Sequence, residues 1–234
     1  MRICVMSDIH GYLPMINECD VVCICGDILP LDIQRITRAS LDWLKTEFLD
    51  WTKQIPAKHV VMIWGNHDFV GERTMEEGVS QSEFIFGENS NIYILNDELK
   101  EIDGVKFYGT PWCPNLYNWA FYKPSLDLTE AFNKIPEDTN ILLTHCPPMY
   151  GQQGIVLQEC WNQYRNFGCP ELQEAIICKF GGKEEDTYVF SGHIHSGNHD
   201  FEIMNNVYYR NVSIKDEEYQ AVYTPFYFDY VKES

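Results

Sequence analysis

The stretch Ser191-Gly192-His193-Ile194-His195 follows the short apolar run at residues 188–190. Such a run predicts a buried strand, and Gly192 supplies a residue that can turn the chain where the strand ends. With a turn there, both histidines can face one ligand. An isolated His-x-His pair is equally compatible with a polar loop that carries two solvated histidines. The other strand ends of the chain therefore decide between these interpretations.

The same arrangement, an apolar run that ends directly in Asp, Asn or His, recurs four more times. Strands are predicted at residues 2–6, 21–25, 59–64 and 140–144, and they are followed by Asp8 and His10, by Asp27, by Asn66, His67 and Asp68, and by His145. Sites in open α/β sheets lie beyond the carboxyl ends of the strands, so we expect these side chains to converge. Carboxylate oxygens and imidazole nitrogens suit zinc, manganese, iron or cobalt. Each match is weak alone, but together they predict a metal site.

The rest of the chain alternates between helical and extended patterns. Apolar residues at helical spacing predict a helix at 30–55, and further helices are predicted at 81–86, 124–135 and 170–180. Additional strands are predicted at 92–95, 105–108, 207–212 and 222–228. Residues 151–168 are typical of a long polar loop that could cover a site. Trp112, between two prolines, is either a plug on the core or one wall of a substrate pocket.

Length and composition favour one domain that spans residues 1–234, because 45% of the residues are apolar and can form a substantial core. No apolar segment is long enough to cross a bilayer, and the N-terminal apolar run is too short for a signal peptide. We therefore expect a soluble, cytoplasmic protein without a membrane partner. The nine cysteines include no Cys-x-x-Cys pair, so reduced core thiols are expected rather than a disulfide framework.

The net charge of −18 limits the kinds of partner. Duplex nucleic acid requires clustered Lys and Arg, and the acidic balance argues against such a partner. A small phosphorylated ligand remains compatible with this charge if divalent metal ions bring the positive charge.

Together, the five blocks resemble the motifs of the calcineurin-like metallophosphoesterase superfamily, which are Asp-x-His, Gly-Asp, Gly-Asn-His-Asp/Glu, His and Gly-His-x-His. The blocks span residues 8–195. This resemblance implies an α/β fold, a four-layer α/β/β/α sandwich of two mixed sheets flanked by helices, as in metallo-dependent phosphatases. It also implies two divalent metal ions, and the sequence leaves open whether these are Mn, Fe, Zn, Co or Ni.

Several further segments resemble the metallophosphoesterase-domain branch, which is similar to class III cyclic-nucleotide phosphodiesterases. They include the loop at residues 108–114, with Thr-Pro-Trp-Cys-Pro, and the stretch Thr-His-Cys-Pro-Pro at residues 144–148. The chain departs from that branch at Ser196, where Glu is usual, and at Asn198-His199. It also lacks the Asp-Arg-Gly that follows Gly-Asp in Ser/Thr protein phosphatases, which counts against a dedicated phosphoprotein phosphatase.

The resemblance assigns a role to each residue of the blocks. The first metal is expected on Asp8, His10, Asp27 and His195, and the second on Asp27, Asn66, His145 and His193. His67 and Asp68 are the expected catalytic residues, with His67 on the phosphate and Asp68 orienting it. Substrate contacts are expected from Asn66, His67, Trp112 and His199.

These roles imply hydrolysis of a phosphodiester by in-line attack of a hydroxide that bridges the two metals. The expected substrate is a small phosphorylated molecule such as a nucleotide, cyclic or otherwise. One alternative is a phosphomonoesterase. Another is a metal-bearing interaction module without catalysis, although members of that kind commonly lose ligands that this chain keeps. The sequence does not indicate an oligomeric state.

Overall fold

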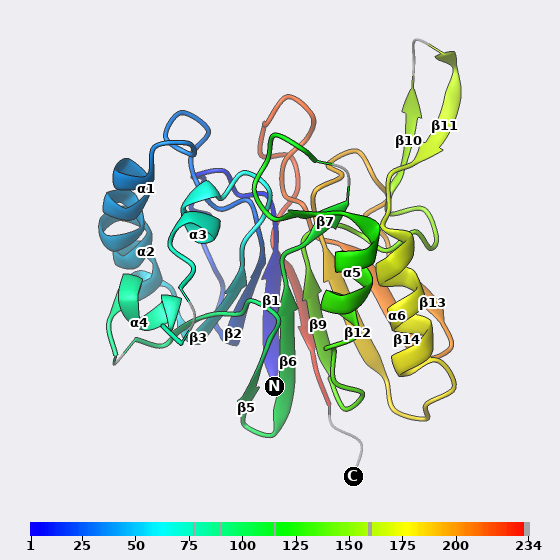
Figure 1. The fold of residues 1–234 in the computed structure, drawn as a ribbon. Coiled ribbons are helices and arrows are strands. Elements are labelled where there is room, and N and C mark those ends of the chain that lie inside the picture. The colour runs from blue at the N-terminus through cyan, green and yellow to red at the C-terminus, as the bar shows by residue number, and fades with distance from the viewer. Residues whose placement is uncertain (77, 89, 115, 159–160, 232–234) are drawn as a thin grey trace.

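The computed structural model of the protein describes residues 1–76, 78–88, 90–114, 116–158 and 161–231. Two mixed sheets pack face to face, and helices cover their outer faces (Figure 1), which confirms the expected four-layer α/β/β/α sandwich. The first sheet has the order β15-β1-β2-β3-β4, and its strands are Phe226–Asp229, Arg2–Met6, Cys19–Cys25, Ala57–Ile63 and Ile92–Ile94. The second has the order β13-β14-β12-β9-β6-β5, and its strands are Glu202–Met204, Val207–Asn211, Thr187–Ser191, Ile141–Thr144, Val105–Thr110 and Glu98–Ile102.

The central strands of each sheet are parallel and carry an antiparallel strand at the edge. In the first sheet β1 to β4 are parallel and β15 runs against β1. In the second sheet β6, β9, β12 and β14 are parallel, while β5 and β13 run against their neighbours. The carboxyl ends of the parallel strands consequently lie along one side of each sheet, where the predicted site residues follow.

Alternation along the strands explains the layers. On β1, Ile3 and Val5 join the core between the two sheets, whereas Cys4 and Met6 face the helices that cover the first sheet. On β9, Ile141 and Leu143 join the central core, and Leu142 faces the helices on the second sheet. Strands that are buried on both faces appear in the sequence as continuous apolar runs, and these runs allowed the strands to be predicted.

Helices occupy the two outer layers. The first sheet is covered by α1 (Thr37–Trp43), the π-helical η1 (Leu44–Phe48), α2 (Leu49–Gln54), α3 (Phe69–Arg73) and α4 (Gln81–Phe86). The second is covered by α5 (Ser125–Phe132) and α6 (Pro170–Phe180). The helix predicted from residue 30 begins at Thr37, because the preceding segment forms turns, with Pro30 O accepting from the N–H groups of Ile33 and Gln34. Both helices predicted at 81–86 and 170–180 are confirmed.

The loop prediction for residues 151–168 is wrong, because β10 (Ile155–Gln158) and β11 (Gln163–Asn166) form an antiparallel hairpin there. The hairpin projects from the body (Figure 1), so it packs no face on a core and its sequence lacks apolar alternation. Residues 159 and 160 lie outside the described residues. The short pair β7 (Cys113–Pro114) and β8 (Tyr122–Lys123) was not predicted either.

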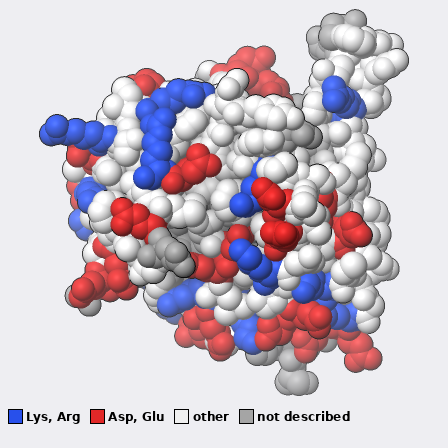
Figure 2. Space-filling view, in the orientation of Figure 1, with Lys and Arg blue, Asp and Glu red and all other residues white. Residues whose placement is uncertain are grey.

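The last predicted strand, at 222–228, begins only at Phe226. The N–H groups of Val222 and Tyr223 both bond Ile214 O, which holds this segment in a loop instead of the sheet. Acidic and basic side chains are interspersed on the face shown in Figure 2. Within the described ranges, no helix is long and apolar enough to cross a membrane.

The cysteines of the described residues are free thiols, in agreement with the sequence prediction. Seven are buried and Cys178 is exposed; the buried ones are Cys4, Cys19, Cys23, Cys25, Cys113, Cys146 and Cys169. Cys23 and Cys25 both lie in the core between the sheets, as their alternation on β2 predicts. Burial raises the pKa of both thiols well above the usual value, so they remain protonated apolar packing groups.

Candidate metal centre

The ends of five parallel strands bring the polar residues of the sequence blocks together. Four groups of three residues could each hold a metal ion, because within each group the ligand atoms lie within 4.8 Å of one another. The groups are Asp8, His10 and His195; His10, Asp27 and His67; Asp8, Asp27 and His145; and Cys113, His145 and His193. β1, β2 and β3 of the first sheet and β9 and β12 of the second each contribute to these residues. The convergence predicted from the sequence is therefore present, and it joins both sheets.

Asp27 lies at the centre of the cluster. Its Oδ2 is 3.3 Å from His145 Nε2, 3.8 Å from His10 Nε2 and 3.9 Å from His67 Nε2. Its Oδ1 accepts the backbone N–H of His67 at 2.7 Å. A carboxylate surrounded by several imidazoles is well suited to bind a metal ion together with them.

The flanking ligands are arranged around Asp27 on either side. His195 Nε2 lies 3.3 Å from Asp8 Oδ1, and its Nδ1 bonds Asp216 O at 2.7 Å. His145 Nε2 lies 2.9 Å from Asn66 Oδ1, and its Nδ1 bonds Cys25 O at 2.8 Å. When Nδ1–H donates its hydrogen bond to the backbone carbonyl, Nε2 keeps the free lone pair that a metal requires.

Backbone conformation at this edge is unusual for non-glycine residues. Asp8, His10, Asp27 and His193 all have positive φ, at 56°, 41°, 54° and 67°. Such residues cost about 1–3 kcal/mol each, and they cluster at functional sites. Close approach adds a further constraint, because a Cβ at Gly192 would lie 2.1 Å from Asp8 Oδ2. The turn that Gly192 was predicted to make is thus also a contact with a candidate ligand.

The residues present fit a bound metal. Both ring nitrogens of His10 are buried and have no hydrogen-bond partner among the described residues. Buried polar groups are normally satisfied, so such orphaned nitrogens indicate an absent ligand. Burial lowers the pKa of His10 and of His193 to about 4, which keeps both imidazoles neutral and able to donate a lone pair.

The carboxylates and the other histidines of the cluster shift one another's pKa values through their charges. Burial alone opposes ionisation of Asp27, but the charges of His145 and His67 outweigh it and hold its pKa well below the usual value. Burial likewise disfavours the charged form of His145, yet attraction to Asp27 raises its pKa to about 10. For His195, the hydrogen bond to Asp8 outweighs burial and raises the pKa to about 9.

These pKa values predict that metal binding releases protons. At pH 7 the imidazoles of His145 and His195 in the metal-free protein are doubly protonated and positively charged, because their pKa values of about 10 and 9 lie above pH 7. A metal ligand must be deprotonated, so binding displaces both protons, and affinity should rise with pH up to that range. We expect acidification when Zn²⁺ or Mn²⁺ is added to stripped protein in a weakly buffered indicator solution. Full metal loading at pH 7 without proton release would contradict this assignment.

The surroundings of His67 differ from the expectation. Asp68 was predicted to orient the His67 ring, but its carboxylate accepts instead from the backbone N–H groups of Ile28, Leu29 and Gly65. The ring Nδ1 lies 2.5 Å from Gln34 Oε1, and Trp119 packs on the ring with centroids 4.3 Å apart. These three N–H groups lie in loops and have no partner in a strand, so the buried carboxylate satisfies them. Asp68 therefore stabilises the loops around the cluster and does not orient the His67 ring.

Two of the expected substrate contacts, Trp112 and His199, have protein partners in this structure. The Trp112 indole N–H donates to both carboxylate oxygens of Asp97, at 3.0 and 2.9 Å, and the ring packs on the core. The structure therefore favours the core plug over the pocket wall. His199 Nε2 contacts His195 O at 3.0 Å, and its ring stacks on Tyr223 at 4.0 Å, so it supports the backbone of a candidate ligand.

Several residues near the cluster were missed by the sequence reasoning. Tyr219 places its ring 5.0 Å from that of His10 and 5.5 Å from that of His195. Cys113 joins His145 and His193 in one of the four groups. Ser196, the departure from the related branch, bonds the carboxylate of Glu217 through both its backbone N–H and its hydroxyl. The signal for Cys113 was its position after a strand end, whereas nothing local marked Tyr219 or Glu217.

The fold and the site together define a metal-binding α/β/β/α sandwich with carboxylate and imidazole ligands at its strand ends. The chain belongs to the calcineurin-like phosphoesterase family, whose model matches residues 1–197. Members of this family are metal-dependent, and the four residue groups above are candidates for the metal sites.

Curated relatives extend this likeness over most of the chain. Metallophosphoesterase domain-containing protein 1 of Homo sapiens is 27% identical over 223 residues, which cover 87% of this chain and 64% of that protein. The UPF0046 protein C25E10.12 of Caenorhabditis elegans is 26% identical over 237 residues, covering 94% and 76%. The chain thus spans slightly less than two thirds of the human relative.

A solved structure described as a novel archaeal phosphodiesterase covers 90% of this chain and 82% of its own, at 17% identity and a TM-score of 0.39.

Proposed function

We propose that this protein hydrolyses phosphodiesters of small nucleotides with the help of two divalent metal ions. The observation that carries the proposal is the position of Asp27, whose one carboxylate oxygen lies within 3.9 Å of three imidazole nitrogens. Asp8, His10 and His195 complete one candidate metal position with Asp27. Asn66, His145 and His193 complete the other.

Two bound ions would supply the positive charge that neutralises the phosphate oxygens and the acidity that would activate a water molecule as the nucleophile. The chain supplies the orientation. Gln34 and Trp119 hold the His67 ring, and His67 Nε2 faces Asp27 at 3.9 Å. In its protonated form, with Nδ1–H donating to Gln34 Oε1, His67 is placed to donate from Nε2 a hydrogen bond to a phosphate oxygen or a proton to the leaving alkoxide.

The test is a hydrolysis screen with bis-nitrophenyl and mono-nitrophenyl phosphate. Protein stripped of metal is resupplied in turn with Mn²⁺, Zn²⁺, Fe²⁺, Co²⁺ or Ni²⁺, and bound metal is counted in parallel. Metal-dependent cleavage of the diester, faster than that of the monoester, is the expected result. Faster cleavage of the monoester would replace the proposal by a phosphomonoesterase. No cleavage of either compound despite two ions bound per chain would replace it by a metal-bearing interaction module.

A further inference from the structure

A cavity of about 400 Å³ adjoins the candidate metal centre on the side of the second sheet. This volume lies within the range of about 300–1,000 Å³ that is usual for small-molecule sites. His193 forms part of its lining, so a molecule bound at the metals would reach into it. The other lining residues come from the segment after β7, from α5, from β11 and the start of α6, and from Ile194.

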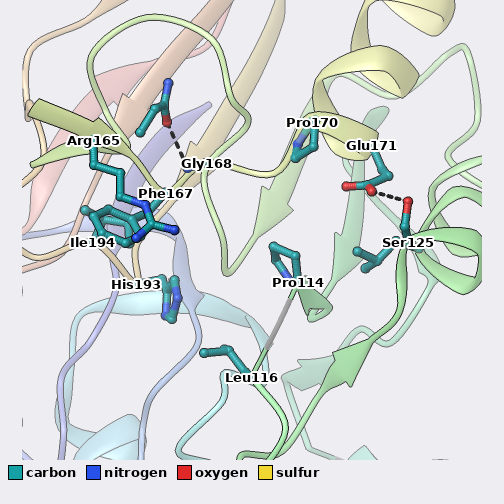
Figure 3. A pocket seen from close by; sticks show the side chains of 12 residues that line it. Pro114, Leu116, Ser125, Arg165, Phe167, Gly168, Pro170, Glu171, His193 and Ile194 are labelled. Carbon is teal, nitrogen blue, oxygen red and sulfur yellow. Dashed lines mark hydrogen bonds between the residues drawn. The ribbon is translucent and has the colours of Figure 1, made fainter.

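One wall of the cavity presents a flat apolar surface with a cation. In Figure 3 the side chains of Arg165, Phe167 and Ile194 lie together beside His193. The Arg165 guanidinium carbon lies 5.1 Å from the centre of the Phe167 ring. No carboxylate of the described residues forms an ion pair with Arg165. Aromatic rings and guanidinium planes are the surfaces on which unpaired nucleobases stack in proteins.

Arg165 also supplies positive charge on a protein that is acidic overall. The chain has 35 acidic and 17 basic residues, so it repels a phosphorylated ligand at long range. The hairpin, at the upper right of Figure 2, has no Lys or Arg in residues 155–166 except Arg165. A cation without an ion-pair partner among the described residues, beside the metal centre, favours an anionic ligand at this place.

The opposite wall presents a carboxylate. Glu171 accepts a hydrogen bond from Ser125 Oγ, and Cys169 Sγ lies 3.3 Å from its other oxygen, Oε2. In Figure 3 Glu171 and Ser125 lie across the cavity from Arg165 and Phe167, and Pro114 and Leu116 lie between the two walls. An ionised carboxylate has lone pairs beyond these two contacts and can accept N–H groups of a ligand.

We propose that this cavity binds the nucleobase of the substituent that stays on phosphorus, with the ring stacked on Phe167 and Arg165 and its amino group donating to Glu171. The inference rests on the proposed phosphodiesterase activity and specifies its substrate as a base-bearing nucleotide ester. A purine or pyrimidine that carries an exocyclic amine matches both walls. A plain aryl or alkyl group matches only the apolar part.

The test compares three nitrophenyl phosphodiesters that share one leaving group and differ in the other substituent, which is adenosine, phenyl or methyl. The full chain, reloaded with Mn²⁺, is expected to have the highest kcat/KM for the adenosine ester. Phe167→Ala should lower the adenosine-over-methyl ratio by roughly 5- to 150-fold, mainly through KM, because stacking contributes that range per base. Glu171→Gln removes the charge at nearly constant shape and should lower the adenosine-over-phenyl ratio about fivefold.

Phe84→Ala is the matched control, because Phe84 is an exposed aromatic residue on α4, over the first sheet, and is not among the residues that line the cavity. It should leave all three rates unchanged. Melting temperature and metal content, measured for every variant, separate loss of a ligand contact from loss of folding. Arg165→Met provides an independent variant at an exposed side chain and should also lower the adenosine-over-methyl ratio.

The outcomes separate the two proposals. Metal-dependent cleavage of all three esters without a preference for adenosine, or with a preference that all three cavity variants retain, overturns the nucleobase cavity and leaves the phosphodiesterase standing. Equal preference for the phenyl and adenosine esters overturns the role of Glu171. Failure to cleave any ester with full metal content overturns the phosphodiesterase and this inference with it.

Discussion

Replacing Asp27 by Asn is expected to abolish both metal binding and hydrolysis. The carboxylate oxygen Oδ2 is within 3.9 Å of His10, His67 and His145, and no other carboxylate in the described residues has that many imidazole neighbours. The amide keeps an oxygen that can accept the His67 N–H, so the fold should survive. Loss of the negative charge that we propose both metals share should remove several kcal/mol of charge stabilisation, which corresponds to a fall in kcat/KM of more than about 10³-fold.

The measurement is metal content per chain by elemental analysis, together with nitrophenyl diester hydrolysis. Asp32→Asn is the matched control, because Asp32 is an exposed residue of the same loop region and lies outside the four ligand groups. It should retain both ions and full activity. An Asp27→Asn protein that holds two ions and turns over at the original rate would remove the basis for the proposed centre.

The second large effect is expected for His67→Ala, which should keep the metals and lose rate. His67 lies within 4.8 Å of the His10 and Asp27 ligand atoms, yet its ring is held by Gln34 and Trp119 and each proposed metal position is complete without it. Loss of a positioned proton donor lowers kcat by typically 10²–10⁴-fold. Metal content should stay at the level of the unmodified protein.

His59→Ala is the control for this variant. His59 belongs to the same strand, β3, and lies near its start, whereas His67 follows its end. It should change neither rate nor metal content. If His67→Ala instead loses a metal ion in proportion to activity, His67 is a ligand and the proton donor must be sought elsewhere, with Tyr219 the nearest hydroxyl-bearing ring to His10.

The two variants distinguish a loss of activity caused by loss of the metals from one caused by loss of a proton donor, which a rate measurement alone cannot distinguish. Asp27 is expected to act through the metals and His67 on the substrate. A double variant should therefore be no slower than Asp27→Asn, because a proton donor contributes nothing once the metals are lost.

Much of this site could be predicted from the sequence because it is built on local features. Each block consists of a strand whose apolar run is visible in the sequence, followed at once by its polar residue, as in Met6 before Asp8 and Cys25 before Asp27. The parallel arrangement then places these residues at one edge with no further information. The layers followed from the same alternation, since Ile3 and Cys4 face opposite cores.

The tertiary structure alone decided the contacts between segments that are distant in the sequence. Gln34 reaches His67 because the segment before α1 forms turns instead of helix, and Tyr219 reaches His10 from a loop more than two hundred residues away. Asp68 satisfies backbone N–H groups forty residues upstream, a requirement that appears only when two loops meet. The sequence of the hairpin that carries Arg165 has no alternation of apolar residues from which a strand could be predicted, because neither of its faces packs on a core. Strand and ligand positions are encoded by local patterns, whereas ring orientation and cavity walls depend on how the two sheets bring their loops together.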